Sequence, residues 1–280
     1  MLSYRHAYHA GNFADVMKHV VLTSILTYLV RKDAALCYLD THAGAGAYDL
    51  RSDKARKTGE SGLGIEKIID ANGAPTCIAN YLQLVRGFNT AGVLDRYPGS
   101  PWFAAQLLRQ QDRLVLCELH NSDFPLLEQL FAKDKRVHCH AVDGYRFSLG
   151  LIPPIERRGL VLIDPAYELA DETMTAFKTL AKLHRRFAGG TFSLWYPILD
   201  EHQGFALRQQ FEASQMRDVL HLALRIADRN SLPGMYGSGM IIVNPPWTLR
   251  AEMQIALPWL VSQLGVNSRA GCEIEQWVEE

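Results

Sequence analysis

Acidic residues follow several short apolar runs in the chain, and their carboxylates could bind a ligand at one place. Glu118, Asp143 and Asp164 each come at the end of such a run. A carboxylate at the position of Glu118 can accept two hydrogen bonds from a ribose diol. Asp143 can accept a hydrogen bond from an adenine amino group, and Gly144 leaves room for the ring. A single acid at a strand end is more often solvated than bound to a ligand, but three in order predict a nucleoside site.

A glycine turn follows the first apolar run. Residues 40–46 read D-T-H-A-G-A-G, with Gly44 and Gly46 where a chain could approach a ligand closely. The dinucleotide fingerprint G-x-G-x-x-G would place its third glycine at Asp49, which argues against NAD. The pattern D-x-x-A-G-x-G is instead typical of S-adenosylmethionine sites. An ordinary glycine turn is the alternative for this segment alone.

The run 160–163 ends in Asp164-Pro165-Ala166-Tyr167, which resembles the D-P-P-Y box of methyltransferases that modify exocyclic amines on adenine. The N6 lone pair is delocalised into the ring, so a site must hold both amine hydrogens and favour a tetrahedral nitrogen. The Asp164 carboxylate and the Pro165 carbonyl supply two acceptors, and Tyr167 offers a face for stacking an extruded base. Ala166 departs from the usual second proline. The alternative is a plain strand that ends in a proline turn.

A second box, Asn244-Pro245-Pro246-Trp247, fits the [D/N/S]-P-P-[Y/F/W] pattern better than the first. The order of motifs decides between them. The glycine turn, the two nucleoside acids and then Asp164 run as expected for the unpermuted fold, whereas Asn244 falls near the end of the sheet. We therefore predict that Asn244 ends the last strand and lines the substrate cleft.

The amino-terminal residues 4–12 interleave aromatic and basic side chains, among them Tyr4, Arg5 and His6. Such a composition suits stacking on bases and pairing with phosphate. Lys18 and His19 follow on the first predicted helix. Each histidine alone is more often structural, but the cluster predicts a lid that contacts nucleic acid.

Two histidines, His138 and His140, lie on one face of a predicted strand, but no third ligand has metal-like spacing, so we expect no metal site. Charge runs at 51–57, 133–136 and 184–186 are most simply solvated faces and secondarily phosphate patches.

Unalternating apolar runs separated by helical patterns predict a parallel sheet with helices on both faces, an α/β fold. The predicted strands are 36–40, 114–118, 137–143, 159–164, 191–196 and 239–244. The predicted helices are an amphipathic one at 14–29 with Asn12 as its N-cap, then 101–109, 124–131 and 172–187. Residues 51–97 are polar, Gly-rich and too long for an ordinary connection. We predict one domain, 1–280, with a helical subdomain inserted at 51–97 after the first strand-helix unit.

The chain of 280 residues has 29 Lys+Arg against 30 Asp+Glu and is 48% hydrophobic, which excludes a coiled coil and a disordered charged tail. With a net charge of -1, a nucleic-acid partner would need local basic patches. No apolar stretch is long enough to span a bilayer. The five cysteines are scattered without a C-x-x-C pattern, so we expect a reduced, cytoplasmic protein.

Segments throughout the chain resemble the bacterial ribosomal RNA large-subunit methyltransferase J family. They are residues 9–19, 39–46, 97–101, 163–167 and 194–197 and the Asn244 box. The resemblance implies a class I methyltransferase, with a Rossmann-like, mostly parallel seven-stranded sheet, that transfers a methyl group from S-adenosylmethionine to N6 of one adenine in 23S ribosomal RNA. It implies that His19, His42, Ser100, Glu118, Asp143 and Gly144 contact the cofactor. The glycine turn adds Gly44 and Gly46 to the predicted cofactor contacts, and we predict that Asp164 also contacts the cofactor. It also implies that Asp164 is the catalytic acceptor and that Tyr4 meets the RNA.

The expected partner is 23S ribosomal RNA, protein-free or in an early assembly intermediate, bound by a monomer with no membrane attachment. The same fold could instead methylate DNA adenine or a protein glutamine amide, since each presents an amine to a similar box. A nicotinamide-dependent oxidoreductase is opposed by Asp49. A non-catalytic RNA-binding protein is opposed by Asp164, Pro165 and Tyr167 beside a cofactor turn.

Overall fold

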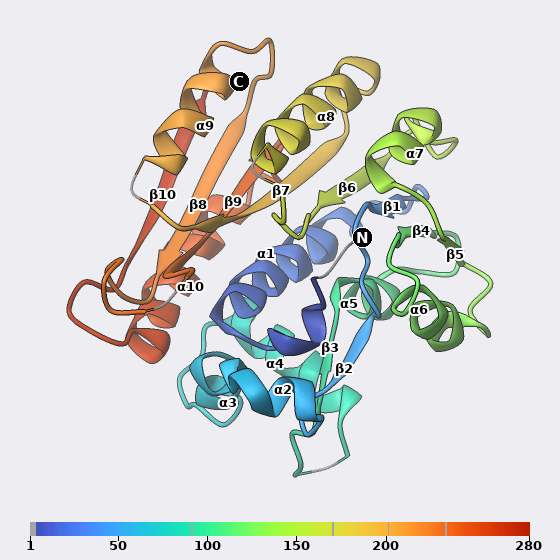
Figure 1. Ribbon diagram of the computed structural model, residues 1–280. Coiled ribbons are helices and arrows are strands. Elements are labelled where there is room, and N and C mark those ends of the chain that lie inside the picture. Colours follow the sequence, from blue (N-terminus) through green and yellow to red (C-terminus); the bar gives the residue numbers. More distant parts are fainter. Residues whose placement is uncertain (1–3, 91, 170, 201, 233) are drawn as a thin grey trace.

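An eight-stranded sheet forms the centre of the computed structural model, which describes residues 4–90, 92–169, 171–200, 202–232 and 234–280 (Figure 1). The order of its strands is β10-β8-β9-β7-β6-β1-β4-β5. They span β1 Cys37–Asp40, β4 Arg113–Cys117, β5 Val137–His140, β6 Gly159–Ile163, β7 Thr191–Ile198, β8 Val219–Arg225, β9 Gly237–Val243 and β10 Gly271–Val278.

Five neighbouring strands, from β5 to β7, pair in parallel. β9 is antiparallel to both β7 and β8, and β10 is antiparallel to β8. The α/β prediction is confirmed, and all six predicted strands are present. The prediction of seven strands needs a correction, because β10 adds an eighth strand at the edge and the sheet is mixed.

Helices cover both faces of the sheet (Figure 1). One face carries α1 Phe13–Leu29, α3 Ile65–Ile68, α4 Thr76–Phe88, α5 Ser100–Leu107, α6 Phe124–Phe131 and α10 Leu249–Leu264. The other face carries α7 Gly144–Leu151, α8 Glu172–Arg186 and α9 Gln203–Glu212. Among the described residues no helix combines the length and the apolar character that a membrane span requires.

The first helix is central to the molecule. Asn12 caps α1 as predicted, because its side chain accepts hydrogen bonds from the amides of Ala14 and Asp15. The prediction of one apolar face was wrong, since every residue from Phe13 to Leu26 is buried. The reason is that β9 packs on one side of α1 while α4, α5 and α10 pack on the others. The polar residues of α1 are therefore interior groups that need partners.

Residues 51–97 form mostly helices between β1 and α5. They include α2 Asp53–Thr58, the 3-10 helix η2 Glu60–Leu63, α3 and α4, and the antiparallel strands β2 Ala47–Asp49 and β3 Arg96–Pro98 flank them. Ile65, Ile78 and Tyr81 are buried in the same core as α1. These residues of the segment therefore share the core that α1 belongs to, and the description of 51–97 as an inserted subdomain of one domain stays a prediction.

Candidate active site

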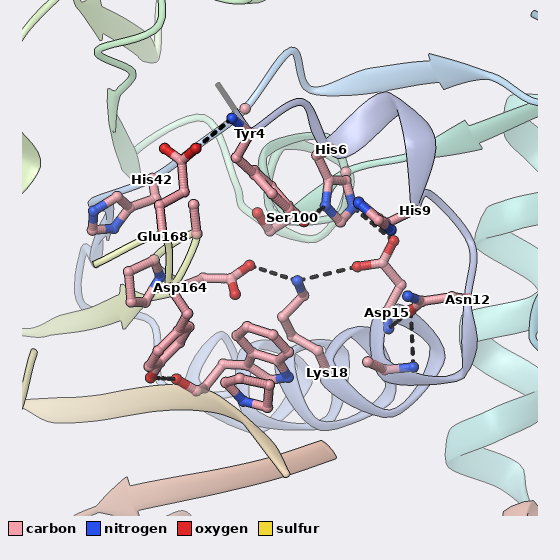
Figure 2. A pocket seen from close by; sticks show the side chains of 18 of the residues that line it. Tyr4, His6, His9, Asn12, Asp15, Lys18, His42, Ser100, Asp164 and Glu168 are labelled. Carbon is pink, nitrogen blue, oxygen red and sulfur yellow. Dashed lines mark hydrogen bonds and ion pairs between the residues drawn. The ribbon is translucent and has the colours of Figure 1, made fainter. Parts of the chain in front are cut away.

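A cavity of about 770 Å³ opens at the edge of the sheet where β1, β4, β5 and β6 end. Figure 2 shows the side chains that converge there from α1, the amino-terminal segment and the turn after β6. Thirteen of the fifteen residues predicted to form the site line it: Tyr4, His6, Lys18, His19, His42, Gly44, Ser100, Glu118, Asp143, Gly144, Asp164, Pro165 and Tyr167. These thirteen residues therefore lie around one continuous cavity, and the roles predicted for them stay predictions.

The other two predicted residues do not line the cavity. Gly46 lies against α6, where an added Cβ would come within 2.9 Å of Leu130 and 3.0 Å of Leu127. The Arg5 guanidinium pairs with Asp123 at 2.9 Å. Cofactor contact by Gly46 and RNA contact by Arg5 stay predictions.

The glycine turn holds Glu118 in place. The amide of Gly44 donates to one Glu118 oxygen at 2.7 Å, and the amide of His120 donates to the other at 2.6 Å. Gly44 has a φ of +61°, and a Cβ there would lie 2.2 Å from the Tyr48 hydroxyl, so only glycine fits. Burial raises the pKa of Glu118. Each carboxylate oxygen keeps a further acceptor site, so Glu118 can still bind a diol.

Asp40 is completely buried at the end of β1. It accepts hydrogen bonds from the Ser100 hydroxyl at 2.7 Å and from the Tyr38 hydroxyl at 2.8 Å. Burial raises the pKa of Asp40 to about 6. Because Ser100 donates its proton to Asp40, the lone pairs of its oxygen are left to accept from an N–H group in the cavity.

Asp143 is the N-cap of α7, where it accepts from the amides of Tyr145 and Arg146. A Cβ on Gly144 would lie 2.0 Å from the carbonyl oxygen of Thr41. Glycine is therefore required for close packing of two backbones, a reason that the sequence interpretation did not include. The edge of His42 lies against Tyr145, with ring centroids 4.7 Å apart. Burial lowers the pKa of His42 to about 4, so its ring is neutral near pH 7.

Asp164 meets a buried cation. The Lys18 ammonium lies 2.5 Å from Asp164 and 3.1 Å from Asp15 (Figure 2). Burial lowers the pKa of Lys18, but the two carboxylates outweigh this effect and raise it above its usual value. Lys18 is therefore charged, and it also lies 5.1 Å from the centroid of the Trp195 ring. Its predicted contact with RNA stays a prediction.

Tyr167 is held in a strained backbone conformation, with a φ of +53°. Its hydroxyl donates to the carbonyl of Trp195 at 2.5 Å, and the two rings meet edge to face at 5.5 Å. Strain of this kind persists where the surrounding structure fixes the residue, and it is frequent at functional sites.

A chain of polar contacts joins Asp164 to the amino-terminal segment. From Lys18 it continues through Asp15 to His6 at 2.8 Å, and from His6 to the Tyr4 hydroxyl at 2.9 Å. The Tyr4 amide donates to Glu168 at 2.7 Å, just after the Asp164 turn (Figure 2). The segment therefore reaches from α1 to the turn after β6. Because these groups are linked by hydrogen bonds and ion pairs, a change in one should affect its neighbours in the chain.

Sequence reasoning missed several residues that line the cavity, including Asp15, Trp195, Tyr145 and Glu168. Asp15 offered a signal, because an acid inside a largely apolar helix must find a partner. Trp195 offered only its place in the segment 194–197 that resembles the family, since it belongs to a mostly buried strand with several other apolar residues.

The predicted place of the Asn244 box was wrong. Asn244 does not line the cavity, and β10 follows it, so it does not end the last strand. Its amide group donates to the carbonyls of Ala188 and Gly190, both at 2.7 Å, just before β7 begins. The reason is that β9 is antiparallel to β7, which places the end of β9 at the opposite edge of the sheet.

The site combines a glycine turn, strand-end carboxylates and a neutral buried histidine, and the described residues include no group of three His, Cys, Asp or Glu side chains that could hold a metal ion. The cavity volume lies in the range of about 300–1,000 Å³ that is usual for small-molecule and cofactor sites. The order β5-β4-β1-β6-β7-β9-β8, with β9 antiparallel, and this site define a class I S-adenosylmethionine-dependent methyltransferase.

The comparisons with known proteins identify the family. The model of the family described as "Ribosomal RNA large subunit methyltransferase D, RlmJ" matches residues 33–279, and the chain belongs to this family. It is 44% identical over 278 residues to the "Ribosomal RNA large subunit methyltransferase J" of Escherichia coli (strain K12), with 99% of each chain covered. It is 43% identical over 279 residues to the protein of the same name from Haemophilus influenzae, again with 99% of each covered.

A solved structure has the same fold. A crystal structure of a protein from Legionella pneumophila (strain Philadelphia 1) superposes with a TM-score of 0.88 and is 36% identical, covering 96% of this chain and 98% of that one. The predicted family is thus confirmed.

Proposed function

We propose that this enzyme transfers the methyl group of S-adenosylmethionine to the exocyclic N6 of one adenine in 23S ribosomal RNA. The main supporting observation is that Asp164 and Pro165, whose carboxylate and carbonyl can accept hydrogen bonds, line the same cavity as Gly44 and Glu118. Two acceptors for an amine thus lie beside a nucleoside-type cofactor site. The names of the relatives from Escherichia coli and Haemophilus influenzae support ribosomal RNA as the substrate.

The residues of the chain have distinct roles in this proposal. Glu118 accepts from the ribose hydroxyls, Asp143 and Gly144 surround the adenine of the cofactor, and Ser100 accepts from the ammonium of its methionine part. His19 and His42 line the same cavity, and burial lowers the pKa of His19 to about 3, so both rings remain neutral. When bound, the cofactor supplies an electrophilic methyl group on a positively charged sulfur.

The turn after β6 prepares the target amine. Lys18 neutralises charge beside Asp164 and occupies one of its oxygens, so the other oxygen can accept an N6 hydrogen. The Pro165 carbonyl accepts the second hydrogen, which favours a tetrahedral nitrogen, and Tyr167 stacks on the extruded base. Most of the acceleration comes from alignment and from fixed dipoles. Tyr4, Arg5, His6 and Lys18 contact the RNA.

We further propose a monomeric, cytoplasmic enzyme that uses no metal and acts on protein-free 23S ribosomal RNA or an early assembly intermediate. Its methyltransferase domain, 1–280, carries the inserted helical subdomain 51–97.

The purified protein should methylate deproteinised 23S ribosomal RNA with labelled S-adenosylmethionine. Digestion to nucleosides should show the label in N6-methyladenosine. Duplex DNA and glutamine-containing peptides, tested in parallel, should remain unlabelled. If the label appeared in the DNA or in the peptide but not in the RNA, the proposed RNA substrate would be wrong and the labelled molecule would be the substrate class instead. Ribosomal RNA from cells that lack the protein should lose one methylated adenine.

A further inference from the structure

Helix α2 presents a group of cations beside the mouth of the cavity. Lys54, Arg56 and Lys57 form what we call the α2 face; Arg56 and Lys57 are exposed and Lys54 is partly exposed. Within the described part of the chain no carboxylate lies within 4.0 Å of their charged atoms, although the neighbouring Arg51 has such a partner in Asp95. These charges are therefore available to a ligand.

The α2 face is attached to the site by specific contacts. Thr58, the last residue of α2, lines the cavity, and its hydroxyl donates to the carbonyl of Tyr8 in the 3-10 helix η1, His6–Tyr8. The Lys57 ammonium lies 6.0 Å from the centroid of the Tyr8 ring. Glu60, which follows, also lines the cavity and pairs with His9 at 2.7 Å. The face is thus fixed against the segment that carries Tyr4 and His6.

The described ranges contain other neighbouring cations that have no carboxylate partner, but these lie away from the cavity. They precede the strands β1, β5, β6 and β7, and they are Arg31 with Lys32, Lys133 with Lys135, Arg157 with Arg158, and Arg185 with Arg186. Residues that precede parallel strands lie at the amino-terminal edge of the sheet, opposite the cavity. Because the net charge is -1, attraction to RNA must come from a local patch, and the α2 face is the patch beside the site.

We infer that the α2 face binds phosphates of the RNA backbone that flank the target adenine, an inference that rests on the proposed function. Phosphate contacts position a nucleic acid without reading its sequence. The extruded base enters the cavity while the adjoining strand crosses η1 and α2, where Arg56 and Lys57 pair with its phosphates. The face therefore sets the affinity for RNA and takes no part in methyl transfer or in cofactor binding.

The test is Arg56→Gln/Lys57→Gln in the full-length protein, compared with the wild type on 23S ribosomal RNA over a series of salt concentrations. We expect KM for RNA to rise on the order of 10-fold near 0.15 M salt, and the slope of log affinity against log salt to fall by about 1.4–1.8 for two lost phosphate contacts. The kcat and the Kd for S-adenosylmethionine should not change. A short oligonucleotide without the flanking backbone should be methylated equally well by both proteins.

Lys178→Gln/Lys182→Gln is the matched control, because it removes the same charge from exposed positions on α8 across the sheet. It should leave KM and the salt slope as in the wild type. If the α2 variant matches the wild type, or if the control shows an equal loss, the inference is overturned. Failure of the wild type to methylate RNA at all would instead overturn the proposed function. Lys54→Gln alone, with one charge removed, should show about half the change in slope.

Discussion

Two proline turns in this molecule have similar sequences but lie at opposite edges of the sheet. Asp164-Pro165-Ala166-Tyr167 follows β6, and Asn244-Pro245-Pro246-Trp247 follows β9, and both strands are fully buried. Each turn contains a non-glycine residue with a φ of +53°, Tyr167 in one and Asn244 in the other. Only the first lines the cavity. Because β6 and β9 run in opposite directions, strand direction decides which of two like turns can take part in chemistry.

The partners of the two turns differ accordingly. Asp164 faces a charged amine, Lys18, from a helix 146 residues away in sequence. The Asn244 side-chain amide instead donates hydrogen bonds to two backbone carbonyls just before β7. Trp247, in the same turn, is 79% exposed. The first turn lines the cavity and pairs with a cation, whereas the second joins segments of the scaffold.

Replacing Asp164 should have the largest effect on activity. Asp164→Ala removes an acceptor of the target amine, and we expect kcat to fall about 10²–10⁴-fold, the range for loss of a group that handles a proton in the transition state. The Kd for S-adenosylmethionine should change only a few-fold. Single-turnover methylation and calorimetric titration measure the two quantities. An equal loss of both would show that Asp164 holds the cofactor and does not act on the amine.

Lys18 tests whether the active turn depends on its buried partner. Lys18→Met leaves the buried carboxylate of Asp15 and the largely buried carboxylate of Asp164 without the Lys18 cation, and we expect a loss of about 3–5 kcal/mol in the free energy of unfolding. Denaturant titration measures it. Lys18→Arg keeps the charge and should retain most of the stability. A Met variant as stable as the wild type would mean that solvent reaches both carboxylates.

Asp40, at the same edge of the sheet, should make stability depend on pH. Its pKa is about 6 in the folded protein against an ordinary value of 3.8, so between these values the folded state binds the proton and the unfolded state does not. The free energy of unfolding should therefore fall as pH rises from about 4 to 6, by up to ~3 kcal/mol from this group. Above pH 6 the contribution is constant.

The measurement is the difference in unfolding free energy between the wild type and Asp40→Asn at several pH values. Asp49→Asn, an exposed acid in β2, is the control and should keep the wild-type slope. A flat difference across this range would show that Asp40 is ionised when folded, through its hydrogen bonds from Ser100 and Tyr38.

The sequence predicted six strands of the sheet and the acids at their ends, but it did not predict β8 and β10, which lie together at one side of the sheet. Strands β1 and β6 are uniformly buried, so they appear as continuous apolar runs. Strand β10 is an edge strand whose apolar residues are interrupted by Glu273, Glu275 and Gln276. Strand β8 includes the buried His221, so the criterion of a continuous apolar run missed both strands. Contacts between distant segments could not be predicted, because no local pattern pairs Lys18 with Asp164.

Replacing Asn244 tests the second proline turn, and of the four replacements we expect it to have the smallest effect. Asn244→Ala removes two hydrogen bonds to the carbonyls of Ala188 and Gly190 and places alanine at a φ of +53°. We expect the unfolding free energy to drop by about 1–3 kcal/mol, with kcat per folded molecule unchanged. Asn244→Gly, which accepts this φ, should lose less, and the difference isolates the backbone strain. If Asn244→Ala abolished turnover while Asp164→Ala retained it, the roles of the two turns would be reversed and strand direction would not be the deciding feature.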